Sequence, residues 1–201
     1  MVPIAVGQGQ LLEPPPVRRV IVPRGHASWW GIDPSTQRVS VAYSASIDGE
    51  VRRDVRTVPF APGEGPARLS AIYDATRAFV VQCVSLDYGA FPLPGVVLIE
   101  QPSGKMDNPN LSYAVGVIQA AVYDGLHDLL ARAPHIETVT SSHWKKVACG
   151  RGDLYKPKSR SGYYEVLVWA RRHGYAGSSW DEADAMGIAD CARREIALEE
   201  R

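Results

Sequence analysis

Acidic residues close two short apolar segments of this chain. Asp33 follows residues 29–32, and Glu100 follows residues 96–99. Both segments have the length and the apolar character of buried strands. A lone carboxylate is costly to bury at the end of such a strand. The sequence therefore predicts a sheet whose strand ends bring acidic side chains to one place.

A second acidic pair lies near the C-terminus. Asp181 and Asp184 are three residues apart at the start of an apolar segment predicted to be helical from about Trp180 to Glu199, so they share one face. Ser179-x-x-Glu182 has the form of a capping box, in which Ser179 caps the helix and Glu182 bonds back to the cap amide. Acids at this position also complement the helix dipole without any further role.

Together the four carboxylates have the chemistry of a divalent-metal site. Magnesium prefers hard oxygen ligands, and manganese is expected to substitute for it. Two simpler readings stay open at single positions. Asp33 can bond backbone amides in an Asp-Pro-Ser turn, and Glu100 can be an exposed carboxylate after its strand.

Hydrophobic periodicity predicts the fold class. The predicted strands cover residues 28–32, 39–44, 51–58, 95–99 and 136–140, and the predicted helices cover 67–84, 110–130, 143–149, 161–173 and 180–199. Asp48-Gly49 marks a hairpin, and Asn110 is expected to cap its helix. Three antiparallel strands followed by βαβ-type units predict an α/β domain with a mixed five-stranded sheet and helices on both faces. Residues 1–27 are treated as a Pro-rich N-terminal extension, and 28–201 as the domain.

Four motifs resemble those of a known family in order and approximate spacing. They are Gly31-Ile32-Asp33-Pro34-Ser35, Ile99-Glu100-Gln101, residues 145–152 followed by Lys156, and Asp181-x-x-Asp184-Ala185-Met186-Gly187-Ile188-Ala189. This chain resembles the RuvC Holliday-junction resolvases, of phage type. The resemblance implies an RNase H-like fold and a magnesium-dependent endonuclease that cuts branched DNA by two-metal hydrolysis in recombination, repair or replication. It implies Asp33, Glu100, Asp181 and Asp184 as catalytic metal ligands.

Basic residues gather between positions 145 and 172, although the chain as a whole has 22 Lys plus Arg against 22 Asp plus Glu. The resemblance assigns DNA contacts to Lys145 and Lys156. Candidates for further phosphate contacts are Lys146, Arg151, Lys158 and Lys105. A solvated charged loop is the simpler reading. Trp144 can stack on a base, but a Trp in an amphipathic helix is more often part of the core.

The segment 101–106 departs from many bacterial relatives. It carries Gly104 and Lys105 where those proteins have an aromatic residue that enters the opened junction. Charge and flexibility favour any phosphate-dense branch point. We therefore expect this protein to accept forks and flaps as well as four-way junctions.

The resemblance also implies a homodimer through the helix Leu111–Leu130, because a resolvase cuts two strands symmetrically. The helicase partner is unknown. Three alternatives remain: an RNase H-fold nuclease for another substrate such as an RNA–DNA hybrid, a non-catalytic junction-binding scaffold, and an actin-like ATPase. The ATPase is the weakest, since that class needs a second related half.

Other sequence features predict little chemistry. The five histidines form no H-x-x-x-H pair, so no zinc site is expected. Cys83, Cys149 and Cys191 lack metal-binding spacing and are expected to be reduced core thiols. No signal peptide or membrane span is visible, and we expect a cytoplasmic protein, in the host cytoplasm if it is phage-encoded.

Overall fold

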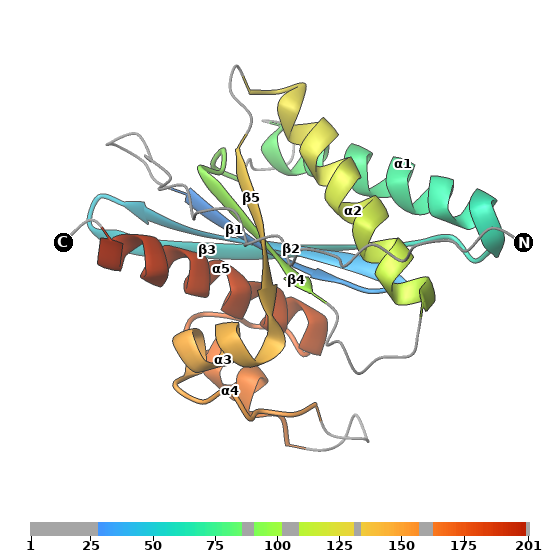
Figure 1. Ribbon diagram of the computed structural model, residues 1–201. Helices are drawn as coiled ribbons and strands as arrows, with labels where there is room; N and C mark the ends of the chain where they lie inside the picture. Colours follow the sequence, from blue (N-terminus) through green and yellow to red (C-terminus); the bar gives the residue numbers. More distant parts are fainter. Residues whose placement is uncertain (1–27, 86–90, 102–108, 131–133, 157–162, 200–201) are drawn as a thin grey trace, which may run out of the picture.

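A five-stranded mixed sheet forms the centre of the computed structural model, which describes residues 28–85, 91–101, 109–130, 134–156 and 163–199. The strands are β1 (Ser28–Pro34), β2 (Arg38–Ile47), β3 (Glu50–Pro59), β4 (Val96–Gln101) and β5 (His135–Thr140), in the order β3-β2-β1-β4-β5 (Figure 1). β1 pairs antiparallel with β2 and parallel with β4. The predicted sheet is confirmed.

A two-residue turn joins β2 to β3, as the sequence predicts. Asp48 and Gly49 have φ values of 54° and 81°, and Ile47 pairs with Glu50 across the turn. Positive φ at both central positions suits the right-handed twist of a two-residue hairpin.

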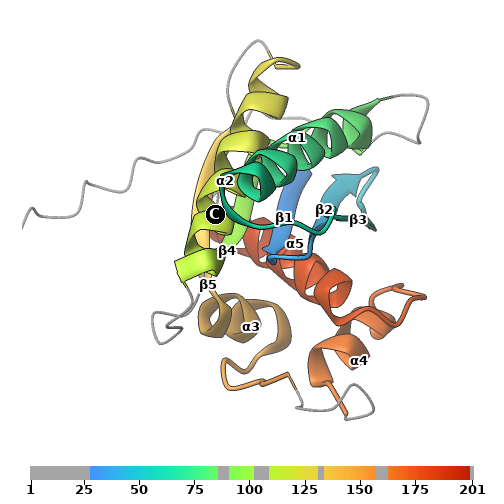
Figure 2. The ribbon, with the colours of Figure 1, turned by 90° about the vertical axis from the view of Figure 1, so that its right-hand side faces the viewer.

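Helices cover both faces of the sheet. α1 (Gly65–Val84) and α2 (Pro109–His127) pack together on one face, and α5 (Trp180–Glu199) crosses the other (Figures 1 and 2). α3 (Ser141–Cys149) and α4 (Glu165–Arg172) pack against α5 on the side away from α1 and α2. The sheet therefore has two separate apolar cores.

Side-chain alternation along β1 assigns its residues to the two cores. Trp30 and Ile32 lie in the core beneath α1 and α2, whereas Trp29 lies in the core beneath α5. Because neighbouring strand residues point to opposite faces, Gly31 and Asp33 share the face of Trp29. The period-2 pattern thus places the Asp33 carboxylate on the same side of the sheet as α5.

Helix α5 runs unusually close to β1. A methyl group at Gly31 would lie 2.2 Å from the Ala189 backbone nitrogen and 2.3 Å from the Ala185 carbonyl oxygen. On the outer side of α5, a methyl group at Gly187 would lie 2.5 Å from the Trp144 ring. These contacts explain why glycine and alanine occur at positions where a bulkier side chain would separate the layers.

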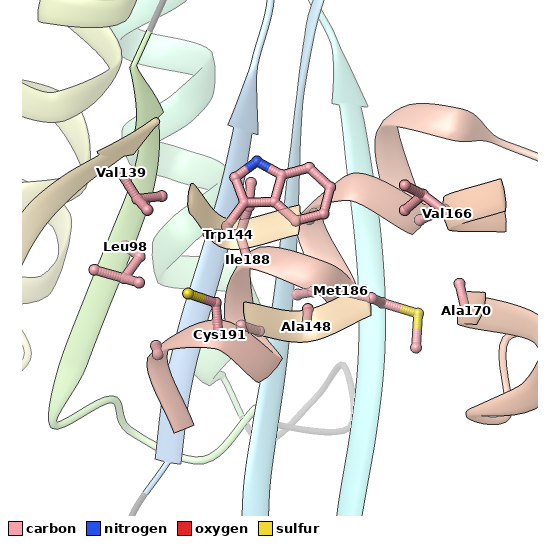
Figure 3. Close-up of a cluster of buried hydrophobic side chains, with 14 of the residues drawn as sticks. Leu98, Val139, Trp144, Ala148, Val166, Ala170, Met186, Ile188 and Cys191 are labelled. Atoms are coloured by element: carbon pink, nitrogen blue, oxygen red, sulfur yellow. The ribbon is translucent and has the colours of Figure 1, made fainter. Parts of the chain in front are cut away.

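The core around α5 joins three helices to the sheet. Figure 3 shows Trp144 and Ala148 of α3, Val166 and Ala170 of α4, and Met186, Ile188 and Cys191 of α5 beside Leu98 and Val139 of the sheet. Trp144 is fully buried, so its predicted core role is confirmed and stacking on a base is excluded in this conformation.

A buried ionic network holds the middle of α5 against the neighbouring elements. Asp190 is fully buried and accepts hydrogen bonds from Arg53 of β3 and from Arg193 and Arg194 of its own helix. Arg194 also donates to the carbonyl of Val147 in α3. Burial opposes ionisation, but the guanidinium hydrogen bonds outweigh it and lower the pKa of Asp190.

Some predicted boundaries are wrong. The helix expected to end at residue 130 ends at His127, and the one expected at 161–173 spans Glu165–Arg172. Asn110 is the second residue of α2 rather than its cap. Helix boundaries shift by such amounts because end residues are stabilised by few contacts.

The predicted capping box is half right. The Ser179 hydroxyl accepts a hydrogen bond from the Glu182 amide, as expected of a cap. Glu182 does not return to the Ser179 amide, which donates instead to the Tyr175 hydroxyl. The Glu182 carboxylate accepts hydrogen bonds from Thr57 of β3 and from Tyr175. Tertiary partners have replaced the local bond.

Within the described ranges, no helix has both the length and the apolar character needed to cross a bilayer. The N-terminal extension and the lysines at 105 and 158 lie outside those ranges.

Candidate active site

Three acidic side chains from separate elements meet at the junction of β1, β4 and α5. Asp33, Glu100 and Asp184 each offer an oxygen, and these atoms lie within 4.8 Å of one another. Asp33 is near the end of β1, Glu100 is on the neighbouring parallel strand β4, and Asp184 is in the first turns of α5. The structure therefore brings together three of the four predicted ligands.

Asp181 lies at the edge of this carboxylate cluster. Its side chain is 27% exposed and makes ion pairs with Arg38 at 3.3 Å and Lys156 at 3.1 Å. A hollow of about 280 Å³ opens beside it, lined by Arg38, Ser178, Ser179, Trp180 and Asp181. Asp181 thus faces the accessible side of the site, while Asp184 is 1% exposed.

A single lysine links the carboxylates. The Lys156 ammonium lies 2.8 Å from Asp184 Oδ2, 3.1 Å from Asp181 Oδ1 and 3.7 Å from Asp33 Oδ2. Burial disfavours the charged lysine, but Asp33 and Asp184 outweigh that effect and raise the pKa of Lys156. A cation is therefore strongly stabilised at this position.

Burial makes the carboxylate cluster electrostatically costly. It raises the pKa of Asp33 well above its usual value, and the nearby charges of Asp184 and Glu100 raise it further. The pKa of Glu100 is raised by burial and by Asp184, and that of Asp184 is raised by burial against the opposing charge of Lys156. Lys156 and Lys145 oppose the rise in the pKa of Glu100 and of Asp184 but do not cancel it.

Two aromatic residues orient the buried acids. The Trp144 indole N–H donates to Glu100 Oε2 at 3.0 Å. The Tyr164 hydroxyl donates to Asp184 Oδ1 at 2.5 Å. Both aromatic rings are buried. The core under α5 therefore fixes the directions of the carboxylates as well as stabilising the fold.

The predicted DNA contacts differ in their surroundings. Lys145 is 7% exposed, its ammonium is 5.2 Å from the Trp144 ring centre, and its charge lowers the pKa of Glu100. Lys145 thus lies buried beside the acids, and its contact with DNA stays a prediction. Lys146 is exposed, and Arg151 is paired with Asp153 and Glu165.

Sequence reasoning missed Arg38 and Tyr164. Arg38 is the first residue of β2 and forms an ion pair with Asp181. Tyr164 directly precedes α4 and donates a hydrogen bond to Asp184. Neither residue carries a local signal, because their roles depend on contacts between distant segments. The acids themselves could be found because each ends or begins a recognisable element.

Comparison with solved structures agrees with this architecture. The structure is similar to Thermus thermophilus RuvC, with a TM-score of 0.60 and 21% identity over 86% of this chain and 96% of that chain. It is equally similar to T. thermophilus RuvC in complex with a Holliday junction substrate, with a TM-score of 0.60 and 20% identity over the same shares. A weaker likeness, with a TM-score of 0.45 and 15% identity, is to the yeast mitochondrial Holliday junction resolvase Ydc2, over 85% of this chain and 79% of that one.

No protein-family profile and no curated protein sequence matches the chain. The likeness is thus one of structure, and it spans nearly the whole of the bacterial protein. The chain has the RuvC-like form of the RNase H-like fold.

Proposed function

We propose that this protein is a magnesium-dependent endonuclease that cuts branched DNA, four-way junctions included. The observation that carries the proposal is the cluster of Asp33, Glu100 and Asp184 at the ends of β1 and β4 and the start of α5. Asp33 and Asp184 are buried, Glu100 is half-buried, and their oxygens lie within 4.8 Å of one another. A fold of the RuvC type supports it, since a solved RuvC holds a Holliday junction substrate.

The donor set fits a hard divalent cation. All three clustered ligand candidates are carboxylates, the oxygen donors that magnesium and manganese favour. Burial raises the pKa of each of these three carboxyl groups, so a bound cation would favour their ionised forms. We assign Asp33, Glu100 and Asp184 to the metal site, with Asp181 as the outermost ligand. When bound, the metal supplies a nucleophilic water and stabilises the leaving oxygen of the phosphodiester.

The chain's own residues provide positioning and charge. Trp144 and Tyr164 hold Glu100 and Asp184 in fixed orientations through their hydrogen bonds. Lys145 offsets the negative charge of Glu100 from within the core. Lys156 is 39% exposed, so its ammonium can meet a DNA phosphate at the mouth of the site. Lys146 and Arg151 are further candidates for phosphate contacts. Lys158 and Lys105 lie outside the described residues and stay candidates from the sequence alone.

A homodimer through α2 would give two such sites for paired cuts. α2 packs on α1 but leaves Tyr113 and Tyr123 exposed, at 64% and 45%. Large aromatic side chains at the surface are enriched at protein interfaces. The molar mass of the protein in solution tests whether this dimer forms. Replacing Tyr113 by a charged residue is expected to favour the monomer.

A panel of labelled substrates tests the proposed function. Wild-type protein with magnesium is incubated with a four-way junction, a fork, a flap, linear duplex and an RNA–DNA hybrid. We expect cutting of the branched DNAs, forks and flaps included, none of the linear duplex, and complete loss in a chelator. Cutting of the hybrid alone would assign an RNase H-type nuclease, and tight junction binding without cutting would assign a scaffold.

Trp144→Phe tests the positioning of Glu100. Phenylalanine keeps most of the packing and removes the indole N–H that donates to Glu100. Losing such an outer partner typically costs roughly 10–100-fold in metal affinity. We expect the magnesium concentration for half-maximal cleavage to rise by at least about tenfold. Trp169→Phe is the control, because Trp169 lies on α4 and takes no part in this hydrogen bond. Equal magnesium dependence of the two variants would show that Trp144 does not position Glu100 for metal binding.

Lys156→Ala tests the phosphate contact. Each phosphate neutralised by a protein cation releases counterions, so losing one contact lowers the slope of log affinity against log salt by about one. We expect weaker junction binding with that smaller slope, measured at several salt concentrations. Arg77→Ala removes an exposed charge on α1, on the opposite face, and should leave the slope unchanged. An unaltered slope in Lys156→Ala would mean that this lysine pairs with the carboxylate cluster and does not contact a DNA phosphate.

A further inference from the structure

A second cluster of ligand-type side chains lies where α3 meets α5. His143, Cys191 and Glu195 each offer a donor atom, and the three atoms lie within 4.8 Å of one another. Cys191 and Glu195 are four residues apart and therefore share one face of α5, while His143 comes from the first turn of α3. The cluster contains none of the four acids assigned to the active site.

Glu195 connects the other two members. One carboxylate oxygen is hydrogen-bonded to His143 Nε2, and the other lies 3.7 Å from the Cys191 sulfur. His143 and Glu195 are half-exposed, with side-chain exposures of 52% and 39%, whereas Cys191 is fully buried in the core of Figure 3. His143 and Glu195 thus lie on the solvent side of the cluster and the thiol on its core side.

The donor set differs in kind from that of the carboxylate cluster. A thiolate, an imidazole and a carboxylate are the three side chains that bind Zn²⁺, and sites with three protein ligands keep a fourth position for water. Magnesium disfavours sulfur and nitrogen donors. We propose that His143, Cys191 and Glu195 form a binding site for Zn²⁺ or a similar soft divalent ion. The absence of an H-x-x-x-H pair did not exclude it, because the ligands come from two helices.

Binding of the ion releases one proton from the protein. The metal–sulfur bond replaces the S–H bond of Cys191, and that proton goes to solvent, while His143 binds as the neutral imidazole and Glu195 as the carboxylate. The ion would tie α3 to α5. Those two helices carry Trp144, which orients Glu100, and Asp184, so the proposed ion would brace the active site without joining it.

Cobalt(II) titration of the full-length, metal-stripped and reduced protein tests the site. Excess magnesium is present to occupy the carboxylate cluster. A thiolate–cobalt charge-transfer band should appear, saturate at one ion per chain and vanish when Zn²⁺ displaces cobalt. Cys191→Ser should lose the band, whereas Cys149→Ser, a half-buried thiol of α3 outside the cluster, should keep it.

A second pair of variants keeps the test decisive if Cys191→Ser fails to fold. His143→Gln and Glu195→Gln alter side chains at the surface, and each should weaken Zn²⁺ binding by at least the roughly 10–100-fold that loss of an outer partner costs. Zn²⁺ should raise the melting temperature of wild type and of Cys149→Ser, and of neither Gln variant. Absence of the band in wild type, or wild-type affinity in both Gln variants, would overturn the proposal.

Discussion

Asp184→Asn is expected to abolish DNA cleavage and leave junction binding intact. Asp184 contributes a buried oxygen to the carboxylate cluster and is 1% exposed. The amide keeps the size of the side chain and can still accept the Tyr164 hydrogen bond, but it removes the negative charge that a divalent ion needs. Metal ions contribute several kcal/mol to phosphodiester hydrolysis, so the rate should fall by about 1,000-fold or more, since each 1.4 kcal/mol is tenfold.

Binding should survive because the cationic surface is untouched. The charge lost is negative, so affinity for the junction should stay equal or increase, as measured by gel shift in calcium or without metal. Asp74→Asn, an exposed change on α1 of the opposite face, serves as the control and should cut at the wild-type rate. Rapid cutting by Asp184→Asn would show that Asp184 is not a catalytic residue. Loss of both cutting and binding would point to misfolding, which circular dichroism would detect.

The sequence predicted the sheet because its signals are local. Apolar runs and the Asp48-Gly49 turn each indicate an element without reference to distant residues. The strand order β3-β2-β1-β4-β5 is known only from the structure, and it is one of the few arrangements that three antiparallel strands and two parallel crossovers allow. The carboxylates were predictable for the same reason. Asp33 and Glu100 are each near a strand end, and Asp184 is near a helix start.

Features that depend on distant segments escaped prediction. Nothing local in Glu182 indicates that it prefers Thr57 and Tyr175 to its own helix cap. The same holds for Lys145, to which the resemblance assigns a DNA contact and which the structure buries next to Trp144. The local sequence around a charged residue does not predict whether its side chain will be buried, or in which core.

Gly31→Ala should be the most damaging single-methyl change in the fold. The added carbon would lie 2.2 Å from the Ala189 nitrogen and 2.3 Å from the Ala185 carbonyl oxygen, both in the backbone of α5. A backbone cannot rotate away as a side chain can, so the helix must move off the sheet. Overpacking typically costs about 1–3 kcal/mol, and we expect at least about 3 kcal/mol here, measured by urea unfolding.

The displacement should also disable the active site. Asp184 precedes Ala185 on α5 and Asp33 lies two residues beyond Gly31 on β1, so separating the layers separates two of the three clustered acids. Gly116→Ala provides the matched control, because a methyl group there meets no atom within 4 Å and replaces glycine inside α2. That variant should be as stable as wild type or more stable by about 1 kcal/mol. Wild-type stability and cleavage in Gly31→Ala would show that α5 does not need this close approach.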